Sequence, residues 1–224
     1  MQTKSISIIR KNVKNFSLKV RPNGSVELVL PLMAKNGDIN FILEKYSKWI
    51  DDKKAYFKEF ETIKKELVSG ESMKFLGKDY RLRVIKDSKE RVEFDKLFIN
   101  LYAKNVENFS KKSEILEKWY RENALIYFLN IANEYNKIIN LDDIKIKIRK
   151  MKTRWGSCNA SKKSINLNLE LIKKPKICIE YVIFHELAHL IHPNHSREFY
   201  NFLSLHMSDW KSREKILNGS SINV

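Results

Sequence analysis

The stretch FHELAHLIHPNHSREFY, residues 184–200, holds four of the five histidines in this chain of 224 residues. Its apolar residues recur at helical spacing, and a step of about 100° per residue places His189 one turn above His185 on the same face. Four apolar side chains fall on the opposite face: Ile183, Leu187, Leu190 and Ile191. The pattern therefore predicts a helix that packs one face into a core and presents two imidazoles on the other.

The two imidazoles and the glutamate that follows the first of them have the spacing H-E-x-x-H. Two neutral imidazoles at i and i+4 can bind one divalent ion, and the adjacent carboxylate can take a proton from water held there. Zinc is the expected ion, because imidazole is a suitable ligand and zinc accepts tetrahedral sites. His185 and His189 are therefore candidate metal ligands, and Glu186 is the candidate general base.

A hydrolytic zinc site usually has three protein ligands, so a third residue is needed. His192 falls close to His185 on an ideal helix, but Pro193 follows, and a residue before proline is disfavoured in helical geometry. The helix is expected to end here, so that the chain can turn back and bring His195 to the metal. Ser196 is typical of the N-cap of a new helix. We favour His195 as the third ligand and expect His192 to be an exposed residue at the helix end.

Two segments before this helix alternate apolar and polar residues, as half-buried strands do. They are IKIKIRK, residues 144–150, and SINLNLELI, residues 164–172. A long helix that begins at Ser113 is expected before them, because apolar residues recur at helical spacing as far as Ile131. We also hypothesise that residues 164–171 form an exposed sheet edge beside the metal, where an extended peptide can pair.

The first part of the chain is predicted to be rich in strands. FSLKVR, residues 16–21, and SVELVLP, residues 25–31, flank the turn signal PNG and predict a hairpin. Asp38 is expected to cap an amphipathic helix over residues 39–50, which continues as an exposed helix towards Leu67. Three more strands are predicted in FLGKDYRLRVI, RVEFD and LFINLYA, between residues 75 and 103.

The polar segment 105–112 is the expected boundary between two subdomains. The prediction is an α+β protein. Residues 1–110 are expected to form a β-rich N-terminal subdomain with one or two helices. Residues 111–224 are expected to form the subdomain that carries the histidine helix.

The composition is that of a soluble, foldable chain, with 43% hydrophobic and 31% charged residues. No apolar run reaches the roughly 18 residues that a membrane helix needs, and the basic N-terminus lacks the apolar core of a signal peptide. The two cysteines, Cys158 and Cys178, form no disulfide framework, so reduced thiols are the default. We expect a cytoplasmic protein without a membrane partner.

The net charge of +16 has two interpretations. Lysines are spread along the whole chain, which is typical of a well-solvated surface. A strongly basic protein can also bind a polyanion, above all a nucleic acid. A nucleic acid is therefore a possible partner.

Several residues near these motifs have a structural and a functional interpretation. Trp155 and Gly156 can shape the floor of the site, or they can be a core residue and a turn. Cys158 can be a fourth metal ligand, although a small buried thiol is the plainer interpretation. Four residues could stabilise an oxyanion, although such residues are more often structural: Arg154, Tyr181, Tyr200 and His206.

Four motifs together resemble the YgjP-like zinc metallopeptidase family, which is related to the SprT- and WLM-type zincins. They are RWGSC at 154–158, INLNLELI at 165–172, YVIFHELAHLIHPNHSREFY at 181–200 and DW at 209–210. The N-terminal hairpin, FLGKDY and EKWYRENA are also similar to that family, so the likeness covers nearly the whole chain. A small departure is Ser208, which stands where proline is common.

The resemblance implies zinc ligands at His185, His189 and His195, with Glu186 as general base. It also implies a zincin-like catalytic half behind the β-rich N-terminal half. The expected activity is then zinc-dependent hydrolysis of peptide bonds in a protein or peptide substrate. The related SprT and WLM groups include proteases that act on proteins attached to DNA, which together with the charge makes a DNA-associated role a further hypothesis.

Two alternative functions use the same histidines differently. A basic nucleic-acid-binding protein could hold zinc only for structure, and such a site is usually closed by four protein ligands, with Cys158 as the candidate fourth. A zinc hydrolase for a non-peptide amide would keep the same site and differ in the shape of its pocket.

Overall fold

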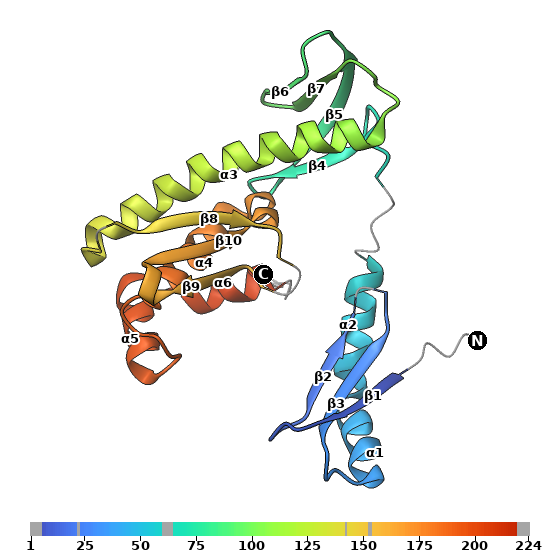
Figure 1. The fold of residues 1–224 in the computed structure, drawn as a ribbon, viewed down its shortest axis with the longest axis vertical. Helices are drawn as coiled ribbons and strands as arrows, with labels where there is room; N and C mark the ends of the chain where they lie inside the picture. The colour runs from blue at the N-terminus through green and yellow to red at the C-terminus, as the bar shows by residue number, and fades with distance from the viewer. Residues whose placement is uncertain (1–5, 22, 60–64, 142, 152–153, 219–224) are drawn as a thin grey trace. The chain divides into compact units, whose positions relative to one another are not determined.

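The computed structural model describes residues 6–21, 23–59, 65–141, 143–151 and 154–218. The chain divides into two compact units, residues 1–65 and 66–224. The described residues form a mixed α and β structure with three small sheets and six α-helices (Figure 1). None of these helices combines the length and the apolar composition that crossing a membrane requires.

The first unit is a three-stranded sheet with two helices. Its elements are β1 (Ile6–Lys11), β2 (Ser17–Val20), β3 (Val26–Pro31), α1 (Asn36–Lys45) and α2 (Ser47–Glu59). The predicted hairpin is confirmed, because β2 pairs antiparallel with β3 and Gly24 has a φ of 74° in the turn between them. Pro22 of the turn signal lies outside the described residues. The sequence did not predict β1, which adds to β3 in parallel.

The structure differs from the sequence prediction at two points of the helices in this unit. Asp38 lies inside the first turn of α1 rather than at its N-cap, and its carboxylate accepts a hydrogen bond from the Lys35 amide at 2.7 Å. The helix expected to continue towards Leu67 is described as far as Glu59, and residues 60–64 lie outside the described part. Leu67 has a φ of 57°, which ends any helical path before that residue.

The second unit begins with a four-stranded sheet, whereas the sequence predicted three strands, because the first predicted strand is interrupted at Gly77 and its start belongs to β4. Its strands are β4 (Ser72–Phe75), β5 (Lys78–Lys86), β6 (Arg91–Phe94) and β7 (Phe98–Ala103), in the order β4-β5-β7-β6. The long helix α3 (Phe109–Ile139) follows. It begins earlier than the expected Ser113, because the Asn108 side chain accepts a hydrogen bond from the Lys111 amide and caps it. The subdomain boundary expected near residue 110 thus falls at the start of α3, inside this unit.

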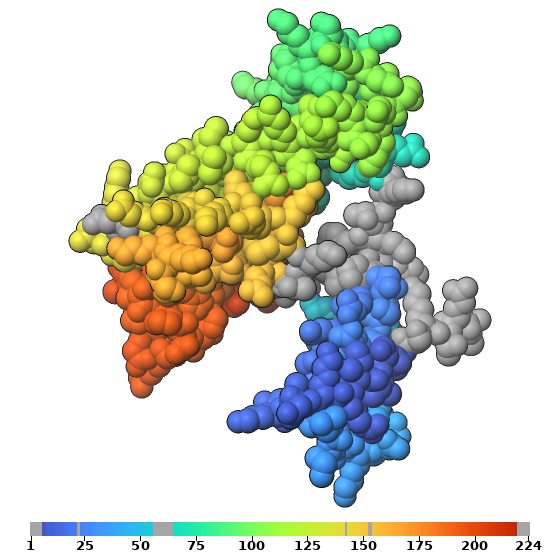
Figure 2. Space-filling view, in the orientation of Figure 1, coloured from blue at the N-terminus to red at the C-terminus, as the bar shows by residue number. Residues whose placement is uncertain are grey.

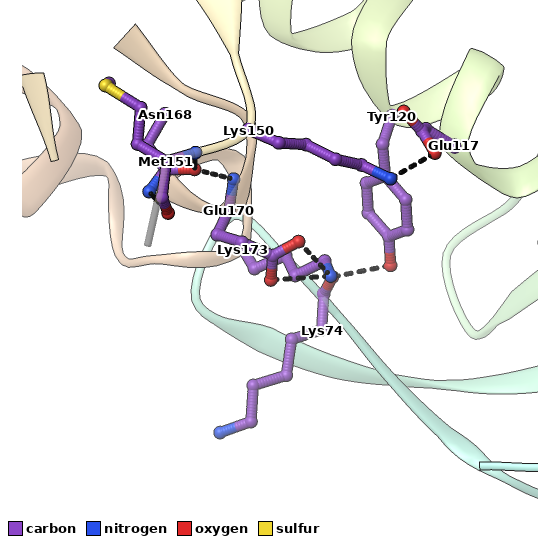
Figure 3. Close-up of polar contacts among 8 residues, drawn as sticks. All are labelled: Lys74, Glu117, Tyr120, Lys150, Met151, Asn168, Glu170 and Lys173. Carbon is purple, nitrogen blue, oxygen red and sulfur yellow. Dashed lines mark hydrogen bonds and ion pairs between the residues drawn. The ribbon is translucent and has the colours of Figure 1, made fainter. Parts of the chain in front are cut away.

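Helix α3 joins the two sheets of this unit through one continuous hydrophobic core. The sheet β4–β7 lies near the N-terminal half of α3. The last sheet of the chain, formed within residues 145–168, runs along the C-terminal half of α3 (Figure 1). The atoms of α3 lie directly against that last sheet in the space-filling view (Figure 2). Polar contacts join the same elements, because the Tyr120 hydroxyl donates to the Lys74 carbonyl at 2.8 Å and Lys150 pairs with Glu117 (Figure 3).

The last sheet contains β8 (Lys145–Arg149), β9 (Gly156–Asn159) and β10 (Ser164–Asn168), in the order β8-β10-β9. The hypothesis that residues 164–171 form a sheet edge is therefore wrong. β10 is the central strand, parallel to β8 and antiparallel to β9, and β9 lies at the edge. The strand is also shorter than predicted, since a 3₁₀ helix, Leu169–Lys173, replaces its last residues.

Asn168 explains why β10 ends where it does. The residue is 5% exposed, although it is one of the polar residues of an alternating segment typical of a half-buried strand. The side-chain oxygen accepts from the Glu170 amide at 3.2 Å, which caps the 3₁₀ helix (Figure 3). Its amide nitrogen donates to the carbonyls of Met151 at 2.8 Å and Arg154 at 3.0 Å, so it also fixes the chain that enters β9.

Three helices complete the unit: α4 (Lys176–Ala188), α5 (Arg197–His206) and α6 (Trp210–Leu217). Helix α4 is almost entirely buried, in keeping with its apolar sequence. Arg213 of α6 holds it in place, because the guanidinium pairs with Glu180 of α4 at 2.6 Å and with Asp209 at 2.9 Å. The aspartate of the DW motif thus helps to fix the helix that carries the histidines.

Candidate metal centre

Helix α4 places the first two histidines one above the other, as the spacing predicts. His185 lies in the last turn of the helix, and His189 is its C-cap with φ −67° and ψ −16°. Because this residue keeps helical dihedral angles, its ring stays on the same face as that of His185. The two ring centroids are 4.9 Å apart.

The chain then reverses and brings the third histidine back, also as predicted. The Nε2 atoms of His195 and His185 are 3.1 Å apart, and the centroids of the His195 and His189 rings are 4.5 Å apart. The reversal ends at Ser196, whose side chain accepts from the Phe199 amide at 3.5 Å as the N-cap of α5. The structure therefore brings His185, His189 and His195 together.

Phe199 is the shared packing partner of the three imidazoles, a role that the sequence did not indicate. Its ring is fully buried, and its centroid lies 5.1 Å from His185, 4.6 Å from His189 and 4.8 Å from His195. The side chain gives all three rings a rigid apolar floor.

His192 contributes to the site through its main chain. Its carbonyl lies 3.2 Å from Nδ1 of His189. A carbonyl can only accept, so Nδ1 carries the proton and the lone pair of His189 is left on Nε2. The His192 ring is half-buried against Phe202 at 5.3 Å, rather than exposed as expected, and it lies outside the histidine cluster.

The three histidines fit a divalent ion that accepts nitrogen ligands. One ligand atom from each ring lies within 4.8 Å of the others. Two nitrogens bound tetrahedrally at 2.0–2.1 Å would be about 3.3 Å apart, close to the 3.1 Å between Nε2 of His185 and His195. Burial lowers the pKa of His185 to about 4, helped by its two histidine neighbours, and burial also lowers the pKa of His189. Both rings are therefore neutral near pH 7, which is the form that binds metals.

Glu186 lies beside the cluster in a confined position. Its side chain is 7% exposed. Burial raises the pKa of its carboxyl to about 7, and the positive charge of Arg154 opposes this rise. A carboxyl with a pKa near 7 can both accept and return a proton at neutral pH. Gly156 of β9 approaches it so closely that an added Cβ would lie 2.5 Å from Glu186 Oε1.

The three histidines and Glu186 line one wall of a pocket of about 540 Å³. Its other wall comes from the start of β9 and the chain around it. The lining residues there are Arg154, Gly156, Ser157, Cys158 and Ala160, with Pro193 from the reversal. The RWGSC motif was the sequence signal for this wall, although the pairing of strands was needed to place it beside the histidines.

Three further candidate residues lie near the histidines or Glu186: Cys158, Tyr181 and Tyr200. Cys158 is half-buried, and burial together with the charge of Glu186 raises its pKa to about 11, so it stays a thiol. It does not belong to the histidine cluster of the described residues. The Tyr200 ring stacks on Trp210 at 5.2 Å and on His195 at 6.1 Å, and Tyr181 contacts His185 edge-on at 5.7 Å.

Comparison with known proteins assigns the family. Residues 14–220 match the sequence model of the YgjP-like metallopeptidase domain. No curated protein matches the chain. Among solved structures, the metallopeptidase zymogen jannalysin of Methanocaldococcus jannaschii is 26% identical over 42% of this chain and 90% of its own, with a TM-score of 0.38. The metallopeptidase zymogen abylysin of Pyrococcus abyssi is 20% identical over 40% of this chain and 90% of its own, with a TM-score of 0.38. Because the family match extends over most of its length, the chain belongs to the YgjP-like metallopeptidase family.

Proposed function

We propose that this metallopeptidase is a zinc enzyme that hydrolyses peptide bonds, with Glu186 as general base. The observation that carries the proposal is the convergence of His185, His189 and His195 beside a buried carboxyl in a single pocket. Zinc is the ion that we propose, because a set of three imidazoles suits it and leaves one coordination position open.

The chemistry divides between the ion and the side chains. His185, His189 and His195 would hold the zinc ion, which would supply a Lewis acid and would lower the pKa of a water molecule to about 7. Glu186 accepts the proton of the attacking water and returns it to the leaving amine. The buried position of its carboxyl favours both steps, since a pKa near 7 allows either protonation state at neutral pH.

The edge strand β9 is the proposed docking site for the substrate main chain. β9 pairs with β10 on one side only within the described residues, and three of its residues line the pocket: Gly156, Ser157 and Cys158. An extended peptide can add to such an edge through main-chain hydrogen bonds. Peptides that carry N-methyl groups at alternate positions should therefore show raised KM, and equal KM for all of them would refute this docking mode.

A structural zinc site is the alternative, and the described geometry does not favour it. Such a site is usually closed by four protein ligands. The group that can hold one ion in the described residues comprises three histidines, and the candidate fourth ligand, Cys158, lies outside it. Loss of zinc binding in a Cys158→Ala variant would support the structural alternative.

The variant Glu186→Gln tests the proposed mechanism directly. It should retain one zinc per chain, measured by elemental analysis, while its cleavage of an unfolded protein substrate falls by at least about 10²-fold. Glu107→Gln is the matched control, because this glutamate is exposed before α3 and is not part of the pocket lining. Equal turnover of Glu186→Gln and wild type would exclude Glu186 as the base.

The pocket residues indicate which part of the chain carries catalysis. All residues that line the pocket lie between 154 and 195, so we propose that residues 111–224, within the second unit, carry the catalytic site. A cytoplasmic location and a nucleic-acid partner stay predictions from composition and charge. Cleavage assays with and without single-stranded DNA test the second of these.

A further inference from the structure

Gly156 and Glu186 share a space that has no room for another side chain. A Cβ built on Gly156 would lie 2.5 Å from Oε1, 2.6 Å from Cγ and 2.8 Å from Cδ of Glu186. Carbon and oxygen atoms that are not bonded do not approach so closely, so one of the two groups would have to move. The carboxyl of Glu186 thus occupies the volume that any larger residue at position 156 would fill.

The need for glycine here is steric and not conformational. Gly156 is the first residue of β9 and pairs with Leu167 of β10, and its φ is outside the left-handed region. Gly77 is different, because it has a φ of +80° and a Cβ there would meet the Pro175 backbone at 2.6 Å. Gly37 is different again, since nothing lies within 4 Å of its Cβ position.

The backbone of Gly156 is held in place from its other side. The side-chain amide nitrogen of the buried Asn168 donates to two carbonyls of the preceding segment, those of Met151 and Arg154. The Asn168 main-chain amide donates to the Trp155 carbonyl at 2.8 Å. The residue next to Gly156 is therefore anchored, and a clash at position 156 is resolved more easily by movement of the Glu186 side chain than by movement of β9.

We propose that Gly156 is a positioning residue for Glu186. Because Gly156 has no side chain, the carboxyl of Glu186 can lie against its Cα. The hydrogen bonds of Asn168 hold the backbone beside Gly156 in position. This inference rests on the proposed role of Glu186 as general base. A methyl group at position 156 displaces the carboxyl from the water that it must deprotonate and leaves the three imidazoles where they are.

The first experiment separates catalysis from metal binding. Gly156→Ala should lower kcat by about 10²-fold, the effect expected for a displacement of about 1 Å, with KM within about twofold of wild type and one zinc per chain. Gly37→Ala is the control for the substitution itself and should keep wild-type kcat. Gly77→Ala is the control for backbone strain and should lower the melting temperature without a matching loss of kcat. Wild-type kcat in Gly156→Ala would overturn the proposal.

The second experiment measures the contact in metal-free protein, so it needs no activity. Gly156→Ala should lower the melting temperature by about 5 °C in the wild-type background, and it should lower it by less than about 1 °C in Glu186→Ala. If Gly156→Ala does not fold alone, the double variant should restore folding. An equal loss in both backgrounds would show that the methyl group meets something other than Glu186 and would overturn the inference. A proven Gly156–Glu186 contact in a protein that cleaves no peptide would instead refute the proposed function alone.

Discussion

The variant Glu186→Gln should stabilise the metal-free protein at pH 8 and leave its stability unchanged at pH 4. Burial raises the pKa of the Glu186 carboxyl from 4.5 to about 7. Below pH 4.5 the carboxyl is protonated in the folded and the unfolded protein, and its contribution to stability is fully present. As the pH rises through 7, ionisation favours the unfolded chain, and this contribution is lost. Glutamine has nearly the same shape and does not ionise, so the variant avoids the loss.

The size of the effect follows from the two pKa values. One pKa unit corresponds to about 1.4 kcal/mol, so a rise from 4.5 to about 7 amounts to about 3 kcal/mol between pH 4 and pH 8. His185 acts in the opposite direction, because its lowered pKa of about 4 gives stability that is present above pH 6.5 and is lost as the pH falls through 4. This histidine is present in both proteins, so its contribution cancels in their difference.

Urea unfolding in the presence of a chelator measures the difference. Three of the four tryptophans report on the unit that contains the site: Trp119, Trp155 and Trp210. The free energy of unfolding of the variant should equal that of wild type at pH 4 and exceed it by about 3 kcal/mol at pH 8. A difference that is the same at every pH would show that the Glu186 carboxyl is not held in a desolvating environment, and the reasoning about its pKa would fail.

Three further substitutions test other parts of the second unit. His195→Ala should weaken zinc binding by at least about 10²-fold in a chelator competition while the far-ultraviolet circular dichroism stays unchanged, since this side chain is exposed and is a proposed ligand. Asn168→Ala should lower the free energy of unfolding in urea by about 2 kcal/mol, because buried main-chain acceptors lose their donors. Lys112→Met should also cost about 2 kcal/mol, because the buried ammonium donates to the Leu67 carbonyl at 2.8 Å, whereas Lys118→Met at an exposed position should change stability by less than about 0.5 kcal/mol.

The local part of the candidate site could be predicted because its signals lie within a few residues of one another. The i and i+4 spacing sets His185 and His189 on one face, and Pro193 ends the helical path. Ser196 then begins the next helix, which returns His195 to the first two rings. Each step depends on backbone geometry over one or two turns, so the sequence carries it without reference to the rest of the chain.

The neighbours of each strand could not be predicted in the same way. An alternating pattern indicates which side chains share a face, but it does not indicate which strand lies alongside. The pattern therefore predicted an edge over residues 164–171, although β8 and β9 pair with β10 on both sides. The same limit applies to Asn168, because the alternating pattern does not show that main-chain carbonyls 14 and 17 residues away accept hydrogen bonds from its buried amide.

Short-range patterns were enough to predict most of the helices and strands, and the three histidines with the glutamate beside them, because periodicity, caps and proline act over short distances. Helix α6 and strand β1 were not predicted. Tertiary structure alone decided that β9 forms the sheet edge at the pocket, that Phe199 underlies all three imidazoles, and that Gly156 lies against Glu186. These contacts join residues that are far apart in the chain, and they depend on which surfaces the packed core leaves next to one another.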